Sequence, residues 1–413
     1  MKKLLILLFI IVASFSLFAS GATEDGGYKD VTNTAFKPML SNDPGSLAYK
    51  LHTNPASLVR NKLVVQLPSV AIEGYNIADA ISQRSVAEAV SRLMKFNFNT
   101  ADLVRLGVGM VENVGSGNNR VLGVNIQAGA AIKRFAFGLD VVLNANTMPS
   151  FRKGTEIPIG SDNENYELQG LGKTAIVPVV DIAATLAYGT RVYDSDSMTV
   201  DAGISVRAIR RLYMEQLDAS SVVNKGMEIN NKATRGGFAF PVDLNVEFGV
   251  FGDNLKASIS ATNLNGYFYM QKYGNYKDAL SMKNGNSKYT VYTPWSLNLE
   301  LELSHSWKLF EPRLSVRFDD IVGFFKYKFA INKLMYPRKE ILRHLSFRAD
   351  IALVKFIRIN AAYKQGYLEF GGALDFYGNT IELSYGYHEA GENYGEKPVD
   401  TLTLRIKLGF DKK

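Results

Sequence analysis

Histidine is the residue type in this chain best suited to acid–base or metal chemistry, and it is scarce. The chain has 413 residues with no Cys and four His, namely His52, His305, His344 and His388. None of them has a second metal ligand at helical or hairpin spacing, and without Cys there is no thiolate nucleophile or zinc–sulfur site. We expect each His to lie on the surface or in a loop. The sequence therefore predicts no enzyme, no metal site and no cofactor.

Charged residues follow a clearer pattern, because they recur at every second position of apolar segments. Near the C-terminus the apolar set Leu402, Leu404, Ile406, Leu408 and Phe410 alternates with the polar set Thr403, Arg405 and Lys407. Successive side chains of a β-strand point to opposite faces, so such a strand has one apolar and one polar face. The same alternation occurs at 122–132, 135–143, 180–188, 198–206, 242–248, 255–261, 295–303 and 345–353. The chain is therefore expected to be all-β.

The lengths of these segments and of the connections between them indicate a membrane protein. The segments are about ten residues long, as a tilted membrane-crossing strand requires. Short turns, such as Lys133-Arg134, alternate with long polar connections at 149–176, 215–241, 270–294, 323–344 and 389–400. A water-soluble sandwich also alternates, but its strands are shorter. We predict a transmembrane antiparallel β-barrel with apolar side chains facing lipid, polar side chains facing the lumen, and short turns in the periplasm.

The number of strands depends on where the barrel begins. About thirteen strands can be counted back from Phe410 to Val121, and bacterial single-chain barrels have an even number, so about fourteen are expected. Leu63–Ile72 and Val104–Glu112 both alternate and both remain candidates for the first strand. Between them, residues 77–94 have apolar positions at helical spacing, which predicts a helical insertion at about 76–94.

The N-terminal region is expected to contain a signal peptide and a plug. Met1-Lys2-Lys3, an apolar run and a small-residue region ending at Ala22 have the order of a cleaved secretory signal. The following region up to residue 62 is polar and lacks strand alternation. We assign residues 1–22 to the signal, 23–62 to an N-terminal hatch in the lumen and 63–413 to the barrel.

The Lys and Arg residues form no block of like charge, which argues against a nucleic-acid partner.

Two short motifs resemble a known family. Asn54-Pro55-Ala56-Ser57-Leu58, just before the first candidate strand, resembles the "NPA" motif of the FadL-like outer-membrane proteins, which include long-chain fatty-acid transporters and the PorV and TraF-like families. The segment 261–266 (ATNLNG) resembles a strand end of the PorV and TraF branches. The resemblance implies a barrel of about fourteen strands. It also implies that Asn54, Pro55 and Ala56 belong to the hatch.

The resemblance also implies a function. Members of the family take up hydrophobic molecules, and ligand leaves through a gap in the wall at a kinked third strand. Residues 135–146 contain Gly138 but no Pro, so the sequence does not support that lateral opening here. We expect a passive outer-membrane channel for hydrophobic molecules such as long-chain fatty acids, with outer-membrane lipid and the ligand as partners. The alternatives are a PorV-like scaffold or shuttle for exported proteins and a general porin. Neither the ligand-binding residues nor the oligomeric state can be assigned from the sequence.

Overall fold

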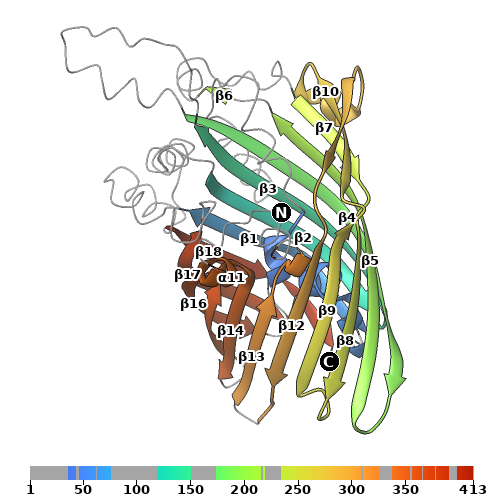
Figure 1. Cartoon of the computed structure of the whole chain (residues 1–413), viewed down its shortest axis with the longest axis vertical. Helices are drawn as coiled ribbons and strands as arrows, with labels where there is room; N and C mark the ends of the chain where they lie inside the picture. The colour runs from blue at the N-terminus through green and yellow to red at the C-terminus, as the bar shows by residue number, and fades with distance from the viewer. Residues whose placement is uncertain are drawn as a thin grey trace, which may run out of the picture.

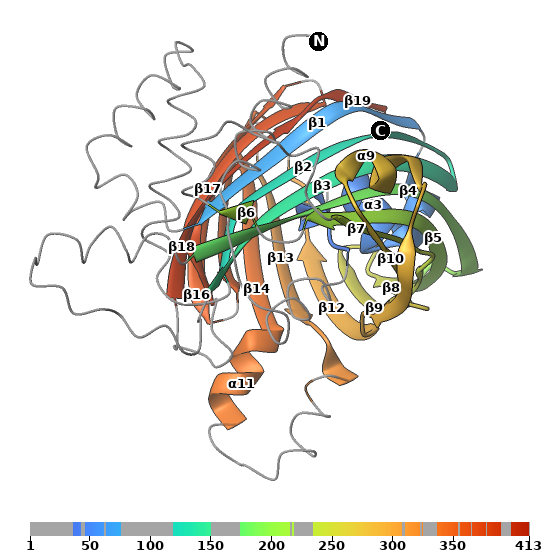
Figure 2. The ribbon, with the colours of Figure 1, turned by 90° about the horizontal axis from the view of Figure 1, so that it is seen from above.

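The strands close into a single antiparallel barrel (Figures 1 and 2). The computed structural model describes residues 36–42, 46–61, 63–75, 119–149, 174–214, 217–218, 234–307, 310–322, 324, 337–353, 356–364, 366–376, 378–389 and 398–412. β1 (Leu63–Tyr75) pairs with β2 (Asn119–Ile132) on one side and with β18 (Pro398–Lys407) and β19 (Gly409–Lys412) on the other, which closes the wall. In this described part of the chain the wall has 14 strands. Because β1 pairs on both sides, these fourteen strands form a closed ring, as a wall in lipid requires.

The remaining strands follow in chain order around the wall. They are β3 (Phe135–Pro149), β4 (Thr174–Asp194), β5 (Met198–Met214), β6 (Leu217–Asp218), β7 (Thr234–Ala239), β8 (Val242–Val250), β9 (Leu255–Leu264), β10 (Tyr267–Tyr273), β11 (Asn286–Tyr292), β12 (Ser296–Ser304), β13 (Phe310–Phe318), β14 (Leu345–Leu353), β15 (Ile357–Lys364), β16 (Tyr367–Phe376) and β17 (Asn379–Glu389). Two short helices, α9 (Tyr276–Ser281) and α11 (Pro337–His344), lie in connections. β7 and β8 both pair with β5, so together they form one interrupted wall strand.

The expected fold class and the first strand are both seen in the structure. β1 begins at Leu63, so the first of the two candidate segments opens the barrel. The tight β2–β3 hairpin turns at Lys133, whose φ of 53° is the left-handed conformation that such turns use. The second candidate segment, the helical insertion and the signal peptide lie outside the described residues.

Two connections expected to be long polar loops are partly sheet. The connection 215–241 contains β7, and 270–294 contains the end of β10, helix α9 and β11. β7 pairs with β5 and β10, and β10 pairs with β11, so these strands continue the wall beyond β8, β9 and β12 (Figure 1). The sequence did not predict these strands, because the alternation of apolar and polar residues is interrupted by Gly236-Gly237 and by helix α9.

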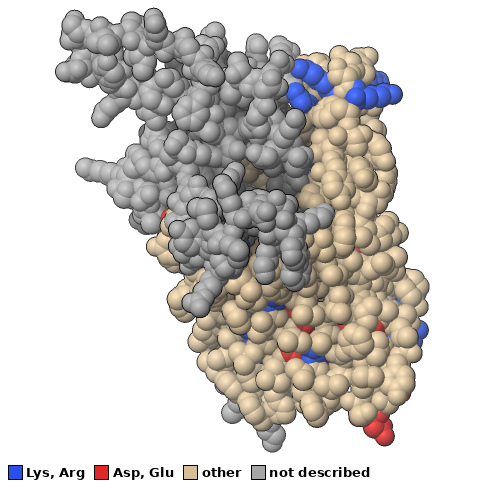
Figure 3. Space-filling model, viewed as in Figure 1, with Lys and Arg blue, Asp and Glu red and all other residues tan. Residues whose placement is uncertain are grey.

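Burial alternates along the strands as a lipid-facing wall requires. On β8, Asp243 and Glu247 are 1% and 3% exposed, whereas their neighbours Leu244 and Phe248 are 45% and 38% exposed. Apolar side chains therefore cover the outside and polar side chains face the lumen. Figure 3 shows a mostly uncharged surface over these strands, with Lys and Arg gathered near the end of β7 and β10. Among the described residues, no helix is both long enough and apolar enough to cross a membrane.

The wall is much taller on one side than on the other (Figure 1). β4 has 21 residues and β5 has 17, whereas β15 has 8. At about 3.3 Å per residue, β4 is roughly 70 Å long, more than twice the ~30 Å hydrocarbon core of a bilayer. The β3–β5 side therefore extends well beyond the membrane on the side of the long connections.

Candidate functional site

An N-terminal segment occupies the lumen, and Figure 2 shows its helix α3 inside the ring of strands. We call residues 36–61 the lumenal segment; their described part contains η1 (Met39–Asn42), α3 (Leu47–His52) and η2 (Pro55–Arg60). Ser46 begins α3 by accepting a hydrogen bond from the Tyr49 amide through its side chain, at 3.0 Å. Leu47 and Leu51 of α3 are buried against Ala131, Ala136 and Ala187 of the wall. The segment is therefore packed as part of the barrel interior.

The Asn54-Pro55-Ala56 motif forms the beginning of η2. The Asn54 side chain accepts a hydrogen bond from the Ser57 amide at 3.2 Å, which caps the helix. Pro55 occupies the first helical position, where its missing N–H is not needed. The Asn54 amide also donates to the Glu247 carboxylate on β8. Each residue type of the motif thus has a structural reason for its place.

Paired glycines on β4 and β5 make room for this motif. Gly189 and Gly203 face each other across the two strands. A Cβ at Gly189 would lie 2.6 Å from Pro55 O, and one at Gly203 would lie 2.8 Å from Ala56 Cα. Real Cβ atoms do not approach so closely, so Pro55 and Ala56 rest directly on the strand backbones.

A second glycine pair receives α3. Gly129 on β2 pairs with Gly138 on β3. A Cβ at Gly129 would lie 3.0 Å from Leu47 Cδ2, and one at Gly138 would overlap Leu51 Cδ1. These two glycine pairs therefore form two seats for the lumenal segment on β2–β5.

His52 is buried in the lumen, so the expectation that every His lies on the surface or in a loop is wrong. It is 6% exposed, and its Nε2 lies 3.0 Å from Asp140 Oδ2 on β3. The Phe36 ring packs edge-on against the imidazole, with centroids 5.6 Å apart. Sequence spacing could not reveal this pair, because 88 residues separate its members. The sequence contained one indication of this pair, because Asp140 stands at a lumen-facing position of the alternating segment 135–143.

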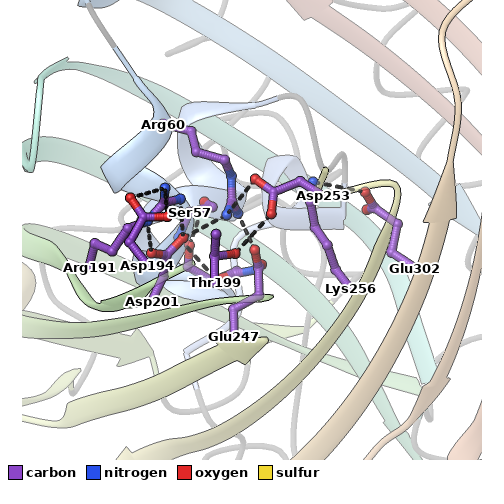
Figure 4. Close-up of polar contacts among 11 residues, drawn as sticks. Ser57, Arg60, Arg191, Asp194, Thr199, Asp201, Glu247, Asp253, Lys256 and Glu302 are labelled. Carbon is purple, nitrogen blue, oxygen red and sulfur yellow. Dashed lines mark hydrogen bonds and ion pairs between the residues drawn. The ribbon is translucent and has the colours of Figure 1, made fainter. Parts of the chain in front are cut away.

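Arg60 fastens the C-terminal end of the segment through several ion pairs (Figure 4). Its Nη1 lies 2.7 Å from Asp201 on β5, and its Nη2 pairs with Glu247 on β8. Arg191 on β4 binds the other Asp201 oxygen at 2.8 Å. Asp201 and Glu247 are almost fully buried, so removing a cation here would leave buried charge.

Towards the long connections, the inner face of the tall side is apolar. Its buried residues belong to β3–β5, β7 and β10, together with Phe36 of the lumenal segment, and are Val142, Val177, Val179, Ala183, Ile209, Tyr213, Ala239, Phe268 and Met270. Tyr289 and Val291 of β11 pack against them. We call this set the apolar lining. On β3–β5 it lies nearer to the long connections than the glycine seats of the lumenal segment do.

A charged pair is embedded in the apolar lining. Arg211 on β5 forms two hydrogen bonds of 2.7 Å with Asp181 on β4, and both side chains are buried. The Arg211 guanidinium also lies 4.1 Å from the centre of the Phe268 ring. The pair is therefore fully satisfied by the protein, which fits a structural role.

The opposite side of the lumen contains cavities lined by both charged and apolar side chains. In the described part of the chain, one cavity of about 850 Å³ lies near the short turns between β1 and β12–β19. A second, of about 270 Å³, lies nearer the long connections, between the lumenal segment and β9 and β12–β15. Asp319 lines the second cavity. Although desolvation acts in the opposite direction, Arg317 and Lys37 hold the pKa of Asp319 below its ordinary value, so it remains charged.

The second motif noted in the sequence lies at the end of β9. Asn263 has a φ of 61°, and its side chain donates to the Thr293 carbonyl oxygen at 2.9 Å. It therefore fixes the break between β9 and β10. Within the described ranges, no group of three or more His, Asp or Glu side chains is arranged to hold a metal ion.

These features define a transmembrane β-barrel whose lumen is partly filled by its own N-terminal segment. By sequence, the chain matches no family model and no curated protein. By structure, it is similar to the toluene transporter TbuX of Ralstonia pickettii, with a TM-score of 0.41, 10% identity and coverage of 93% of this chain and 100% of that one.

A FadL homologue from Pseudomonas aeruginosa is also similar, with a TM-score of 0.38, 10% identity and coverage of 95% and 99% of the two chains. The translocator domain of the autotransporter NalP from Neisseria meningitidis has a TM-score of 0.34, 12% identity and coverage of 87% and 92%. At these identities and TM-scores the likenesses carry no weight for function, which must be inferred from the lumen itself.

Proposed function

We propose that this protein is a passive outer-membrane channel for hydrophobic small molecules such as long-chain fatty acids. The observation that carries the proposal is the apolar lining, because inward-facing side chains of a barrel are ordinarily polar. Val177 and Val179 lie on the same face of β4 as the inward-facing Asp181, yet both are apolar and buried within the apolar lining. An apolar ligand entering from the long connections would meet this surface first.

In this proposal the lumenal segment acts as the hatch, with Asn54, Pro55 and Ala56 at its fixed end. Ligand moves past the hatch. The protein reaches the outer membrane of a diderm bacterium through a cleaved signal peptide, and lipid surrounds its apolar exterior.

The test is ligand uptake into proteoliposomes containing the full-length mature protein. A triple variant, Val142→Thr, Val177→Thr and Val179→Thr, keeps side-chain shape but adds three hydroxyls to the apolar lining. Each unpaired hydroxyl costs about 1–3 kcal/mol, so uptake of a radiolabelled fatty acid is expected to fall at least about tenfold.

Val399→Thr is the matched control, because Val399 is buried on β18, outside the apolar lining. Its uptake should equal that of the unaltered protein. Unchanged uptake in the triple variant would contradict the proposal. Measuring toluene beside the fatty acid shows whether the channel accepts acyl chains, aromatic hydrocarbons or both.

A further inference from the structure

The lumenal segment is fastened to one half of the barrel. Its glycine seats lie on β2–β5, His52 binds Asp140 on β3, and Arg60 binds Asp201 on β5 and Glu247 on β8. The two cavities lie against the other half, which is formed mainly by β12–β18. A solute crossing the barrel without unseating the segment must therefore pass along β12–β18.

The walls of this half are charged. The larger cavity contains Glu311, Asp350 and Asp375 together with Arg313, Arg358 and Lys407. Charged groups are costly to remove from water unless they are fully paired, so such a wall favours water over an apolar ligand. A volume of about 850 Å³ holds on the order of tens of water molecules at ~30 Å³ each.

The contact between Tyr49 and Glu300 lies between the two cavities. Along β12, Asn298 lines the smaller cavity and Ser304 lines the larger one, with Glu300 between them. The Tyr49 hydroxyl of α3 donates to Glu300 Oε2 at 3.1 Å. Tyr49 is 7% exposed, so its ring fills the space between the segment and β12.

We propose that the β12–β18 side of the lumen is a water-filled path for ions and small hydrophilic solutes, closed by the contact between Tyr49 and Glu300. This path lies mainly on β12–β18, whereas the apolar lining lies mainly on β3–β5, β7 and β10; Phe36 borders both. The inference goes beyond the proposed function and holds even if hydrophobic molecules are not the cargo.

Ion conductance of the full-length mature protein in planar lipid bilayers tests the inference. Tyr49→Ala and Glu300→Ala are each expected to raise single-channel conductance at least threefold over the unaltered protein. Tyr49→Phe keeps the ring but loses the hydrogen bond, so a smaller rise is expected. Tyr269→Ala is the matched control, because that ring is 58% exposed on the outer face of β10; its conductance should not change.

Unaltered conductance in both alanine variants, with heat-modifiable gel migration showing an intact barrel, would overturn the inference. Labelling of Ser304→Cys provides a test that leaves the Tyr49–Glu300 contact in place. A charged, membrane-impermeant thiol reagent should modify it from the short-turn side of the vesicle but not from the other side. No labelling from the short-turn side, or equal labelling from both, would also overturn the inference. Loss of fatty-acid uptake alone would contradict only the proposed function.

Discussion

Gly203 on β5 and Ala56 of the lumenal segment are in direct backbone contact. A Cβ at Gly203 would lie 2.8 Å from Ala56 Cα, and no rotation of a side chain can relieve that overlap. Gly203→Ala should therefore unseat η2 and destabilise the barrel by about 1–3 kcal/mol, as overpacking does. Urea unfolding in detergent micelles measures the loss, and hydrogen exchange over residues 54–60 should become faster.

Gly372→Ala is the control for this substitution. Gly372 also lies in a barrel strand, but a Cβ there would be 3.9 Å from the nearest atom, an ordinary contact. Gly372→Ala should change the free energy of unfolding by no more than about 0.5 kcal/mol. Equal effects at the two positions would show that the glycines of β5 do not serve as a seat.

Arg60→Ala should loosen the C-terminal end of the segment while leaving the barrel closed. Without Arg60, Asp201 still has Arg191 as a cationic partner, whereas Glu247 retains only the uncharged Asn54 amide. Glu247 is therefore the carboxylate left buried without a cation. We expect faster protease cleavage within residues 54–61, measured by mass spectrometry of timed digests. The double variant Arg60→Ala and Glu247→Gln removes the buried charge and should recover part of the resistance. Arg60→Ala cleaved at the rate of the unaltered protein would show that the pair does not fasten the segment.

Arg211→Leu should destabilise the protein more than any change at an exposed ion pair. It leaves Asp181 buried without its cation, which costs about 3–5 kcal/mol. Adding Asp181→Ala removes the unpaired charge, so the double variant should unfold closer to the unaltered protein. Equilibrium unfolding of the four proteins forms a double-mutant cycle. A coupling energy near zero would contradict the described pair.

Ile259→Arg tests the orientation of the wall in lipid. Ile259 is 44% exposed near the middle of β9, so arginine there should cost about 2–4 kcal/mol in a bilayer. Ile357 is equally exposed but begins β15 beside a short turn, so Ile357→Arg should cost no more than about 1 kcal/mol. The comparison uses unfolding in lipid vesicles. A reversed order of the two costs would contradict a membrane-spanning β9.

The wall could be predicted from the sequence because period-two alternation depends on neighbours along the chain. The hairpin at Lys133 followed from local pattern alone, whereas that pattern left both Leu63–Ile72 and Val104–Glu112 as candidates for the first strand. The extension formed by β7, β10 and β11 could not be predicted, because those strands are short and because β7, which contains Gly236-Gly237, gains its pairing from β5 and β10. Tertiary context decides such segments.

The lumen was less accessible to prediction than the wall. Asn54-Pro55-Ala56 was noted for its position before the first strand, but the glycines that receive it lie more than 130 residues later, at Gly189 and Gly203. The His52–Asp140 and Tyr49–Glu300 pairs likewise join distant residues. The sequence indicated that inward charges of both signs exist; only the fold shows which of them meet.

The place of the lumenal segment in the chain has a consequence for barrel assembly. η2 ends at Arg60, and β1, which pairs with β18 and β19 to complete the ring, begins at Leu63. A segment tethered so closely to the closing seam has little slack with which to thread into a finished ring. The segment is therefore expected to occupy its glycine seats on β2–β5 before β1 has paired with β18 and β19. Filling of the interior and sealing of the seam are thus coupled into a single late step of folding.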